Sequence, residues 1–348
     1  MDEVQIIKEF QDTLNQLVEA DEFSGAVLVA KDQIILFQQA YGMANQSDQI
    51  PNRIDTRFNL ASLNKMFTGV AVVQLAEQGK LAFSDPVSRY VPAYPREIAE
   101  KVTIHHLLTH TSGLGHYWNK HFWDERFLTE RVKLRTPDDY FPLFRDEPLS
   151  FEPGDRFQYS NAGFIMLGAI VERVSEQEYW TYEREHIFEP AGMNNTDAYE
   201  VDCPPPNQAI GYTHLNRSGE CETGPRRPNL DAVFVKGNPA GYAFSTVEDL
   251  FKFGLSVRSH RFLSPMLTTL VLTGKVEWPD NPGVRYAYGW QERLVNGRRI
   301  VGHGGVGLGV NAHFDLYLDS GYTVVILSNY DAPIARRLAH DLRKHLTS

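Results

Sequence analysis

The segment from Ala61 to Gln78 most constrains how this chain can fold. It reads ASLNKMFTGVAVVQLAEQ and is followed by Gly79, a residue that favours the position just past a helix end. Apolar residues occupy almost every side of the predicted helix, so it has no polar face to turn towards water. Such a helix must lie in the centre of the molecule, with other elements packed around it. A chain of 348 residues is long enough to supply those elements.

Strands are predicted near both ends of the chain. Ser24–Ala30 and Gln33–Tyr41 form two strands joined by a tight turn. Tyr286–Leu294 is followed by Asn296-Gly297, a hairpin signal, and Arg299–His303 is the return strand. Two further strands are expected: an alternating one from Val310 to Leu316 and a buried one from Tyr322 to Ser328. Strands from both ends of a chain assemble most simply into one antiparallel sheet.

Helices are predicted at the two ends and through the middle of the chain. The N-terminal stretch carries Val4, Ile7, Phe10, Leu14 and Leu17 at helical spacing. The other predicted helices are Asn161–Val174, one that begins at Ser245 with Glu248 completing a capping box, and a closing helix Arg336–Leu346.

We therefore predict a single α+β domain over residues 1–348. Residues 1–80 and 231–348 form an antiparallel sheet flanked by the terminal helices. Residues 81–230 form a mainly helical region, and the active site lies between the two.

Charge and composition exclude several classes of protein. The net charge of -10 disfavours nucleic acid and anionic membrane surfaces as partners, since both require a basic face. No apolar run is long enough to span a membrane, and the first twenty residues lack the pattern of a signal peptide. We expect a cytoplasmic protein, and the sequence does not determine its oligomeric state. The chain has two cysteines, Cys203 and Cys221, and the sequence allows either a disulfide between them or two free thiols.

Ser62 and Lys65 are the first candidates for chemistry. Residues three apart on a helix share a face, so the hydroxyl and the ammonium can meet. Ser62 would lie in the first turn, where free N–H groups favour developing negative charge. A serine hydroxyl is a weak nucleophile that needs such help. A serine and a lysine on the surface of a helix would look the same in sequence, but a lysine at the start of a buried helix needs a partner.

Two later segments add further candidates. Tyr159 and Asn161 stand at the start of a predicted helix. A tyrosine beside a lysine can have its pKa lowered and act as a base, and an Asn amide can orient a carbonyl or Lys65. Ser160 or Asn161 could equally be a plain helix cap. His303-Gly304-Gly305 ends a strand, where glycines allow a ligand close to the backbone and the histidine can move a proton. A plain glycine-rich connection remains the alternative.

The histidines and aromatic residues of the middle region favour packing over ligand binding. His105, His106, His110, His116 and His121 lack the carboxylate or cysteine spacing of a metal site, so no metal is expected. Aromatic residues run from Tyr117 to Tyr140 and are expected in the core, with some lining a pocket: Tyr117, Trp118, Phe122, Trp123, Phe127 and Tyr140.

Taken in order, the three segments resemble the serine β-lactamase and penicillin-binding-protein superfamily, in particular the class C β-lactamase-like branch with its esterases and D-amino-acid peptidases. Further similar stretches are Val102–Leu114, Phe151–Gly168, Ala240–Phe253 and Tyr288–Asn329. The resemblance implies a β-lactamase/transpeptidase-like fold and a hydrolase that uses no cofactor.

The resemblance also implies roles for individual residues. Ser62 would be acylated, and Lys65 and Tyr159 would carry its proton. Asn161 would orient the substrate, and His303, Gly304 and Gly305 would line the site. The backbone N–H groups of Ser62 and Val306 would form the oxyanion hole.

One departure from the family pattern concerns the substrate. Lys-Thr-Gly or Lys-Ser-Gly is usual in β-lactamases where this chain has His303-Gly304-Gly305. The groups that would meet a substrate carboxylate are therefore missing. We expect hydrolysis of carboxylic esters or small amides through an acyl-enzyme. The alternatives are a β-lactamase, a D-alanyl-D-alanine carboxypeptidase or D-aminopeptidase, and a catalytically silent relative that binds a ligand or forms a scaffold.

Overall fold

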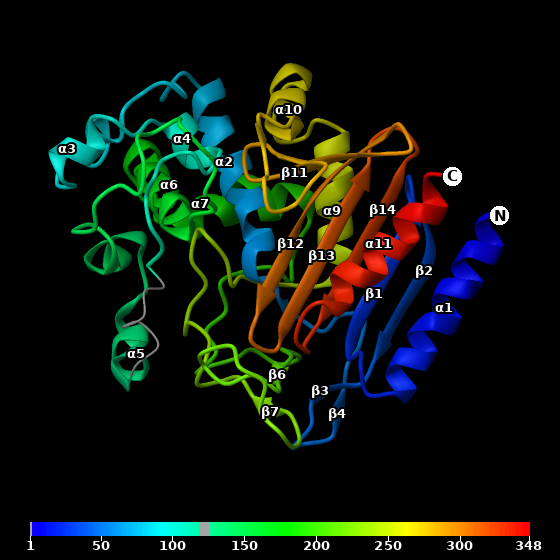
Figure 1. The fold of residues 1–348 in the computed structure, drawn as a ribbon. Helices are drawn as coiled ribbons and strands as arrows, with labels where there is room; N and C mark the ends of the chain where they lie inside the picture. The colour runs from blue at the N-terminus through cyan, green and yellow to red at the C-terminus, as the bar shows by residue number, and fades with distance from the viewer. Residues whose placement is uncertain (1, 118–124) are drawn as a thin grey trace.

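An eight-stranded antiparallel sheet forms the centre of the computed structural model, which describes residues 2–117 and 125–348 (Figure 1). The strands lie in the order β2-β1-β14-β13-β12-β11-β10-β9. Their bounds are β1 Gly25–Lys31, β2 Ile34–Tyr41, β9 Val276–Glu277, β10 Val284–Tyr286, β11 Gln291–Val295, β12 Arg298–Gly307, β13 Val310–Tyr317 and β14 Tyr322–Ser328. The α+β prediction is confirmed.

The strand that comes first in the sequence, β1, pairs directly with the strand that comes last, β14. The register of β1 on β14 runs from Gly25 opposite Ser328 to Lys31 opposite Tyr322. Both strands are buried on both faces, apart from the partly buried Lys31. This burial explains why both strands are apolar runs without clear alternation.

One face of the sheet is covered by α1 (Glu3–Glu19) and α11 (Ile334–Leu346), which Figure 1 shows side by side. Phe10 and Leu14 of α1 and Leu338 of α11 pack in one apolar cluster with Val324 of β14. The stripe predicted for the first helix is confirmed in part. Phe10, Leu14 and Leu17 are buried with Ile6, whereas Val4 is 79% exposed.

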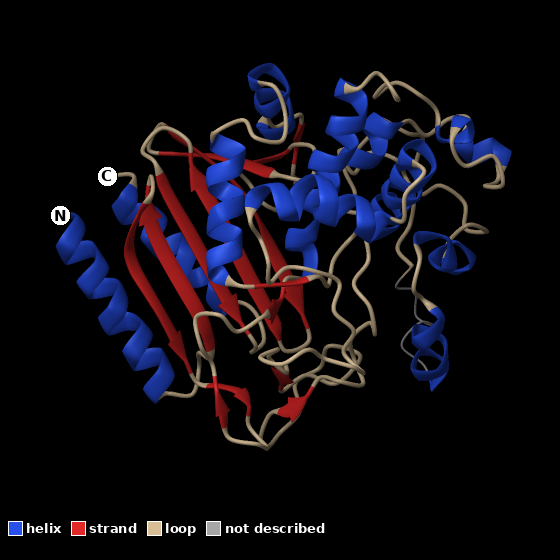
Figure 2. Ribbon diagram, turned by 180° about the vertical axis from the view of Figure 1, so that it is seen from behind, coloured by secondary structure: helices blue, strands red, loops and turns tan. Residues whose placement is uncertain are grey.

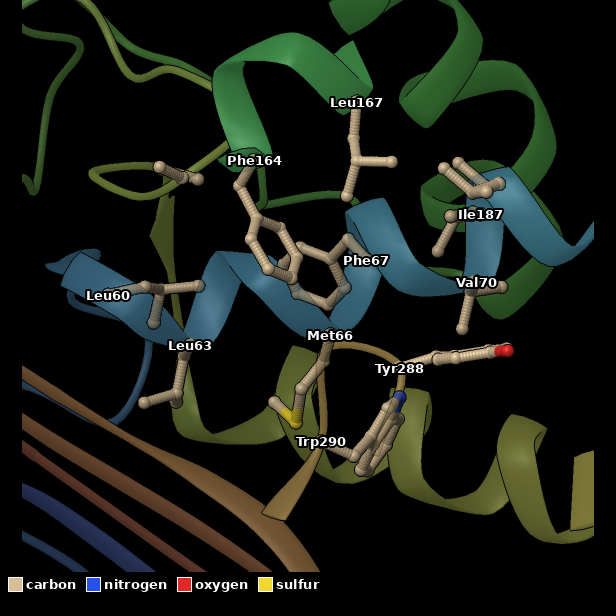
Figure 3. Close-up of a cluster of buried hydrophobic side chains, with 14 of the residues drawn as sticks. Leu60, Leu63, Met66, Phe67, Val70, Phe164, Leu167, Ile187, Tyr288 and Trp290 are labelled. Atoms are coloured by element: carbon tan, nitrogen blue, oxygen red, sulfur yellow. The ribbon is translucent and has the colours of Figure 1, made fainter. Parts of the chain in front are cut away.

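Helices α2 (Lys65–Glu77) and α9 (Val247–Arg258) lie on the other side of the sheet, so that helices flank both faces (Figure 2). As predicted, α2 is surrounded by other elements. Figure 3 shows Met66 beside Trp290, and Phe67 near Phe164 of α6 (Asn161–Ser175). Each of these four side chains is fully buried.

Besides α6, the α-helices between α2 and α9 are α3 Arg96–Ala99, α4 Ile104–Leu108, α5 Glu125–Glu130, α7 Tyr179–Glu183 and α8 Glu189–Ala191. In this middle region, α6 and α7 pack against α2, and α4 packs against α6, whereas α3 and α5 lie farther out (Figure 1). A further helix, α10 Pro265–Leu272, follows α9. None of the helices that the structure describes has the length and apolar character of a membrane span.

Three predicted boundaries were wrong. The cap of α9 is Thr246, which accepts a hydrogen bond from Asp249 N–H, and not Ser245 with Glu248. The predicted strand Tyr286–Leu294 is interrupted between β10 and β11 by a turn in which Ala287 N–H donates to Trp290 O. Strand β12 continues through the glycines to Gly307, because its partner β13 extends equally far.

An ionic cluster is buried between β13 and α11. Arg343 donates from Nε to Asp315 Oδ2 (2.7 Å) and from Nη2 to Asp315 Oδ1 (3.0 Å). His313 Nε2 lies 3.1 Å from Asp315 Oδ1 and also contacts Arg343. Burial is the largest single influence and would raise the pKa of Asp315, but the charge of Arg343, together with the contributions of His313 and Arg293, holds that pKa well below its usual range. The ionised carboxylate therefore joins the helix to the sheet.

A second buried carboxyl group has no such partner. Glu183, at the end of α7, is fully buried, and no cation among the described residues pairs with it; the hydroxyl of Tyr179 is its polar neighbour. Loss of contact with water raises the pKa of Glu183 from 4.5 to about 8. The folded protein therefore binds this proton more tightly than the unfolded chain does.

This difference predicts a pH-dependent stability. Because the folded pKa lies above the unfolded value, the stabilising contribution is complete below about pH 4.5 and is lost as pH rises towards 8. Glu183→Gln removes the titration. We expect the free energy of unfolding of the variant, relative to wild type, to increase by on the order of 3 kcal/mol between pH 5 and pH 8. Urea unfolding at several pH values measures this difference.

The matched control is Glu189→Gln, which changes an exposed glutamate of the neighbouring helix. Its unfolding free energy should follow that of wild type across the same range. If Glu183→Gln also ran parallel to wild type, Glu183 would not be held neutral by the fold.

Candidate active site

Ser62 and Lys65 lie where a short 3-10 turn, η1 (Ala61–Asn64), passes into α2. The turn starts after β5 (Phe58–Asn59), which pairs with β8 (Phe244–Ser245). A hydrogen bond from Ala61 N–H to Asn59 Oδ1 (2.9 Å) fixes its first residue. The predicted first turn is thus a 3-10 turn and not an α-helical one. The i and i+3 side chains still meet, with Ser62 Oγ 3.1 Å from Lys65 Nζ.

Lys65 is fully buried and has the partners that its position requires. Its Nζ donates to Asn161 Oδ1 (2.7 Å) and to the backbone oxygen of Ala240 (2.5 Å). Burial lowers the pKa of Lys65 well below its usual value. A neutral amine has two N–H groups, and the two carbonyl oxygens accept both. Its lone pair is then free to accept the proton of Ser62.

The backbone beside Ser62 is held in an unfavourable conformation. Ala61 has φ 43° and Tyr242 has φ 70°, in the left-handed region that few residues with a side chain adopt. The two are joined, since Tyr242 N–H donates to Ala61 O (3.1 Å). Strained residues of this kind persist only where the surroundings enforce them, and they gather at functional sites. Here they set the direction of η1 and of the segment that carries Ala240.

Tyr159 and Asn161 flank the N-cap of α6. Ser160 is the cap and accepts a hydrogen bond from Gly163 N–H (3.2 Å), so the capping interpretation is confirmed. The ring of Tyr159 lies 4.9 Å from Lys65 Nζ. Burial raises the pKa of Tyr159 above its usual range, although a hydrogen bond with Ser62 lowers it. The expected lowering beside a lysine is therefore wrong. In this site Tyr159 keeps its proton and can donate it.

His303 faces Tyr159 from β12, with a ring-centre separation of 6.4 Å. Its Nδ1 donates to Gly304 O (2.6 Å), and its Nε2 accepts from Tyr286 O–H (3.0 Å). Burial, followed by the nearby Lys65, lowers the pKa of His303 to about 3. The imidazole is neutral at pH 7 and brings no positive charge to the site.

The glycines beside His303 differ in the space around them. A methyl group on Gly305 would lie 2.2 Å from Leu60 O, whereas one on Gly304 would meet nothing closer than His313 Nδ1 at 3.7 Å. Gly305 therefore lets β12 approach the backbone just before Ser62. Val306 follows on the same strand, and its side chain is 61% exposed.

Alanine should destabilise the protein at Gly305 but not at Gly304. Gly305→Ala must push β12 away from η1, because the clash is with backbone. We expect a loss of about 1–3 kcal/mol in stability. Gly304→Ala is the matched control and should stay within about 0.5 kcal/mol of wild type. Thermal unfolding measures both. Equal effects would contradict the close approach at Gly305.

The histidines of the middle region serve local structure. His106 completes a capping box with Thr103, and His110 Nδ1 accepts from Ser160 N–H (3.1 Å). Within the part of the chain that the structure describes, no three His, Cys, Asp or Glu side chains form a group able to hold a metal ion. Cys203 and Cys221 are exposed free thiols.

The predicted aromatic core is confirmed for Tyr117 and Tyr140, both 1% exposed. Trp118, His121, Phe122 and Trp123 lie outside the described residues, as does the side chain of Phe127.

Two neighbours of Tyr159 escaped the sequence analysis as parts of the site. The ring centre of His110 lies 4.2 Å from that of Tyr159, and Trp278 is stacked on it at 5.5 Å. His110 belongs to a stretch that the resemblance covers, but nothing local connects it with Tyr159. Trp278 follows the second segment by more than a hundred residues and carries no motif.

Known proteins are similar to this chain in both sequence and fold. Penicillin-binding protein 4* of Bacillus subtilis is 32% identical over 360 aligned positions, which cover 96% of this chain and 76% of that protein. Esterase EstB of Burkholderia gladioli is 34% identical over 232 positions, covering 64% of this chain and 57% of EstB. The crystal structure of a penicillin-binding protein from Bacillus halodurans superimposes with a TM-score of 0.83 at 34% identity, covering 96% of this chain and 98% of that one.

A sequence model of a whole protein family also matches this chain. The sequence model named Beta-lactamase matches residues 10–348, from the first helix to the end of the chain. The match includes all three segments that meet around Lys65. This chain belongs to the Beta-lactamase family of serine hydrolases and penicillin-binding-protein-like proteins.

Proposed function

We propose that the protein is a serine hydrolase that cleaves uncharged carboxylic esters or small amides through an acyl-enzyme on Ser62. The observation that carries the proposal is the environment of Lys65. Its buried amine lies 3.1 Å from Ser62 Oγ, and its two other hydrogen bonds go to carbonyl oxygens. This is the arrangement of a nucleophile with its general base.

The proposed reaction uses the protonation states that the site favours. Lys65 takes the proton of Ser62 as Ser62 Oγ bonds to the substrate carbonyl carbon. The backbone N–H groups of Ser62 and Val306 stabilise the oxyanion. As the bond to the leaving group breaks, Tyr159 donates its proton to that group and recovers one from Lys65. Water then attacks the carbonyl carbon of the acyl-enzyme and gives a proton to Lys65. The bond between that carbon and Ser62 Oγ breaks, and Lys65 returns the proton to Ser62.

The charge of the site supports uncharged substrates. Where β-lactamases carry a lysine, this chain places a buried neutral imidazole, and Gly304 supplies no hydroxyl. A substrate carboxylate brought to this strand would lose its water without gaining a cation. The similarity to EstB, an esterase, agrees with an ester substrate.

Short p-nitrophenyl esters test the proposal. We expect wild-type protein to hydrolyse p-nitrophenyl acetate and butyrate, and to hydrolyse a penicillin at least about 100-fold less efficiently. Intact-mass and peptide analysis of quenched reactions should show one acyl group on Ser62. Hydrolysis without an adduct at Ser62, or efficient hydrolysis of the penicillin alone, would overturn the proposal.

A further inference from the structure

Among the described rings that contact Tyr159, the indole of Trp278 lies most nearly parallel to the Tyr159 ring. The two planes are only 18° apart, with centres 5.5 Å from one another. The indole also contacts Phe157 (5.3 Å) and Tyr286 (6.0 Å), the latter being the hydrogen-bond partner of His303. Trp278 thus touches the groups around the site without belonging to any of the three segments.

The hairpin that carries Trp278 is closed by its own hydrogen bonds. Trp278 N–H donates to Val284 O (3.0 Å), and Trp278 O accepts from Asn281 N–H (3.0 Å). An ion pair between Glu277 and Arg285 (3.1 Å) also spans the two strands, but it is exposed and contributes little, so the backbone hydrogen bonds hold the hairpin. The position of the indole is therefore set before a substrate arrives, and its stacking can hold a second ring in place.

Tyr159, in contrast, has a side chain whose position is not fixed by regular backbone. It precedes the N-cap of α6 and lies in irregular backbone, so no helix or strand fixes its side chain. Its aromatic contacts are with His110, Trp278, Tyr286 and His303, and Lys65 Nζ lies 4.9 Å from the ring centre. His110 is anchored through Ser160 N–H, next to Tyr159 itself, whereas Trp278 comes from a distant hairpin.

We propose that Trp278 is a positioning residue, which holds the Tyr159 hydroxyl where it protonates the leaving group. This inference rests on the proposed function. It assigns Trp278 to one proton transfer and leaves the attack of Ser62 on the carbonyl to Lys65. Its loss should therefore matter most for substrates whose leaving group cannot depart without a proton.

Two esters of the same acid separate these steps. Ethyl acetate and p-nitrophenyl acetate give the same acetyl-enzyme, but ethoxide needs protonation and p-nitrophenolate leaves readily as an anion. For Trp278→Ala we expect kcat/KM for ethyl acetate to fall about 10- to 100-fold, and that for p-nitrophenyl acetate to fall less than about threefold. Trp278→Phe keeps a stacking ring and should restore ethyl acetate hydrolysis to within about threefold of wild type.

The control is Glu277→Ala, which breaks the exposed ion pair on the same hairpin and should leave both rates unchanged. An equal fall for both esters in Trp278→Ala, or no fall for either, would overturn the inference while leaving the serine hydrolase intact. A wild type that hydrolyses neither ester and forms no acetyl adduct on Ser62 would overturn the proposed function and this inference with it.

Discussion

Replacing Ser62 by alanine is expected to lower kcat for p-nitrophenyl acetate hydrolysis at least about 10⁴-fold. The methyl group of alanine can form no acyl-enzyme, and Lys65 then has no proton to take. The remaining activity would come from substrate binding and the oxyanion donors. Stability should change by less than about 1 kcal/mol, because Lys65 keeps Asn161 and Ala240 as acceptors.

The control for this prediction is Ser259→Ala, a serine at the end of α9 that is remote from the site in sequence and exposed. Its rate should equal that of wild type. If Ser62→Ala retained wild-type activity while remaining folded, another nucleophile would have to be sought. The adduct expected on Ser62 would then be absent as well.

The largest expected effect on stability concerns Asp315. Asp315→Ala removes the carboxylate that Arg343 binds through two nitrogens and leaves that guanidinium, only 6% exposed, without a counter-charge. Arg293, whose Nη1 lies 3.8 Å from the same carboxylate, loses its neighbour too. Breaking one side of a buried ion pair costs about 3–5 kcal/mol. Guanidinium chloride unfolding at pH 7 should show that loss.

Helix α11, which carries Arg343, also offers an exposed ion pair for comparison. Asp341 accepts from Lys344 at 3.0 Å, with both side chains about half exposed. Asp341→Ala should cost less than about 0.5 kcal/mol, because exposed pairs contribute little. A loss for Asp315→Ala as small as that for Asp341→Ala would show that the buried cluster does not join α11 to the sheet.

The sequence predicts well what depends on neighbours along the chain. The burial of α2 follows from its apolar character on all sides, and the meeting of Ser62 with Lys65 follows from a spacing of three residues. The terminal strands are apolar runs bounded by turns. Their pairing across the whole chain was inferred from the class of fold, and the register of β1 on β14 bears it out.

What the sequence could not predict depends on packing between distant segments. The turn that breaks Tyr286–Leu294 places Gly289 so close to α2 that a methyl group there would lie 2.2 Å from Lys65 O. Ala240 serves Lys65 through a backbone oxygen, which leaves no trace in residue type. The pKa of Tyr159 was misjudged because sequence places a lysine nearby but does not show that the phenol is itself buried, and burial raises its pKa.

The pairing of β1 with β14 also bears on how the protein is made. Strand β1 is synthesised beside one of its partners, β2, but its other partner, β14, follows almost three hundred residues later and ends at Ser328. During synthesis β1 and β2 have only each other, and an isolated hairpin is marginally stable. We expect nascent chains to leave β1 without this partner until β14 emerges, so that the incomplete chain is the form most prone to aggregate.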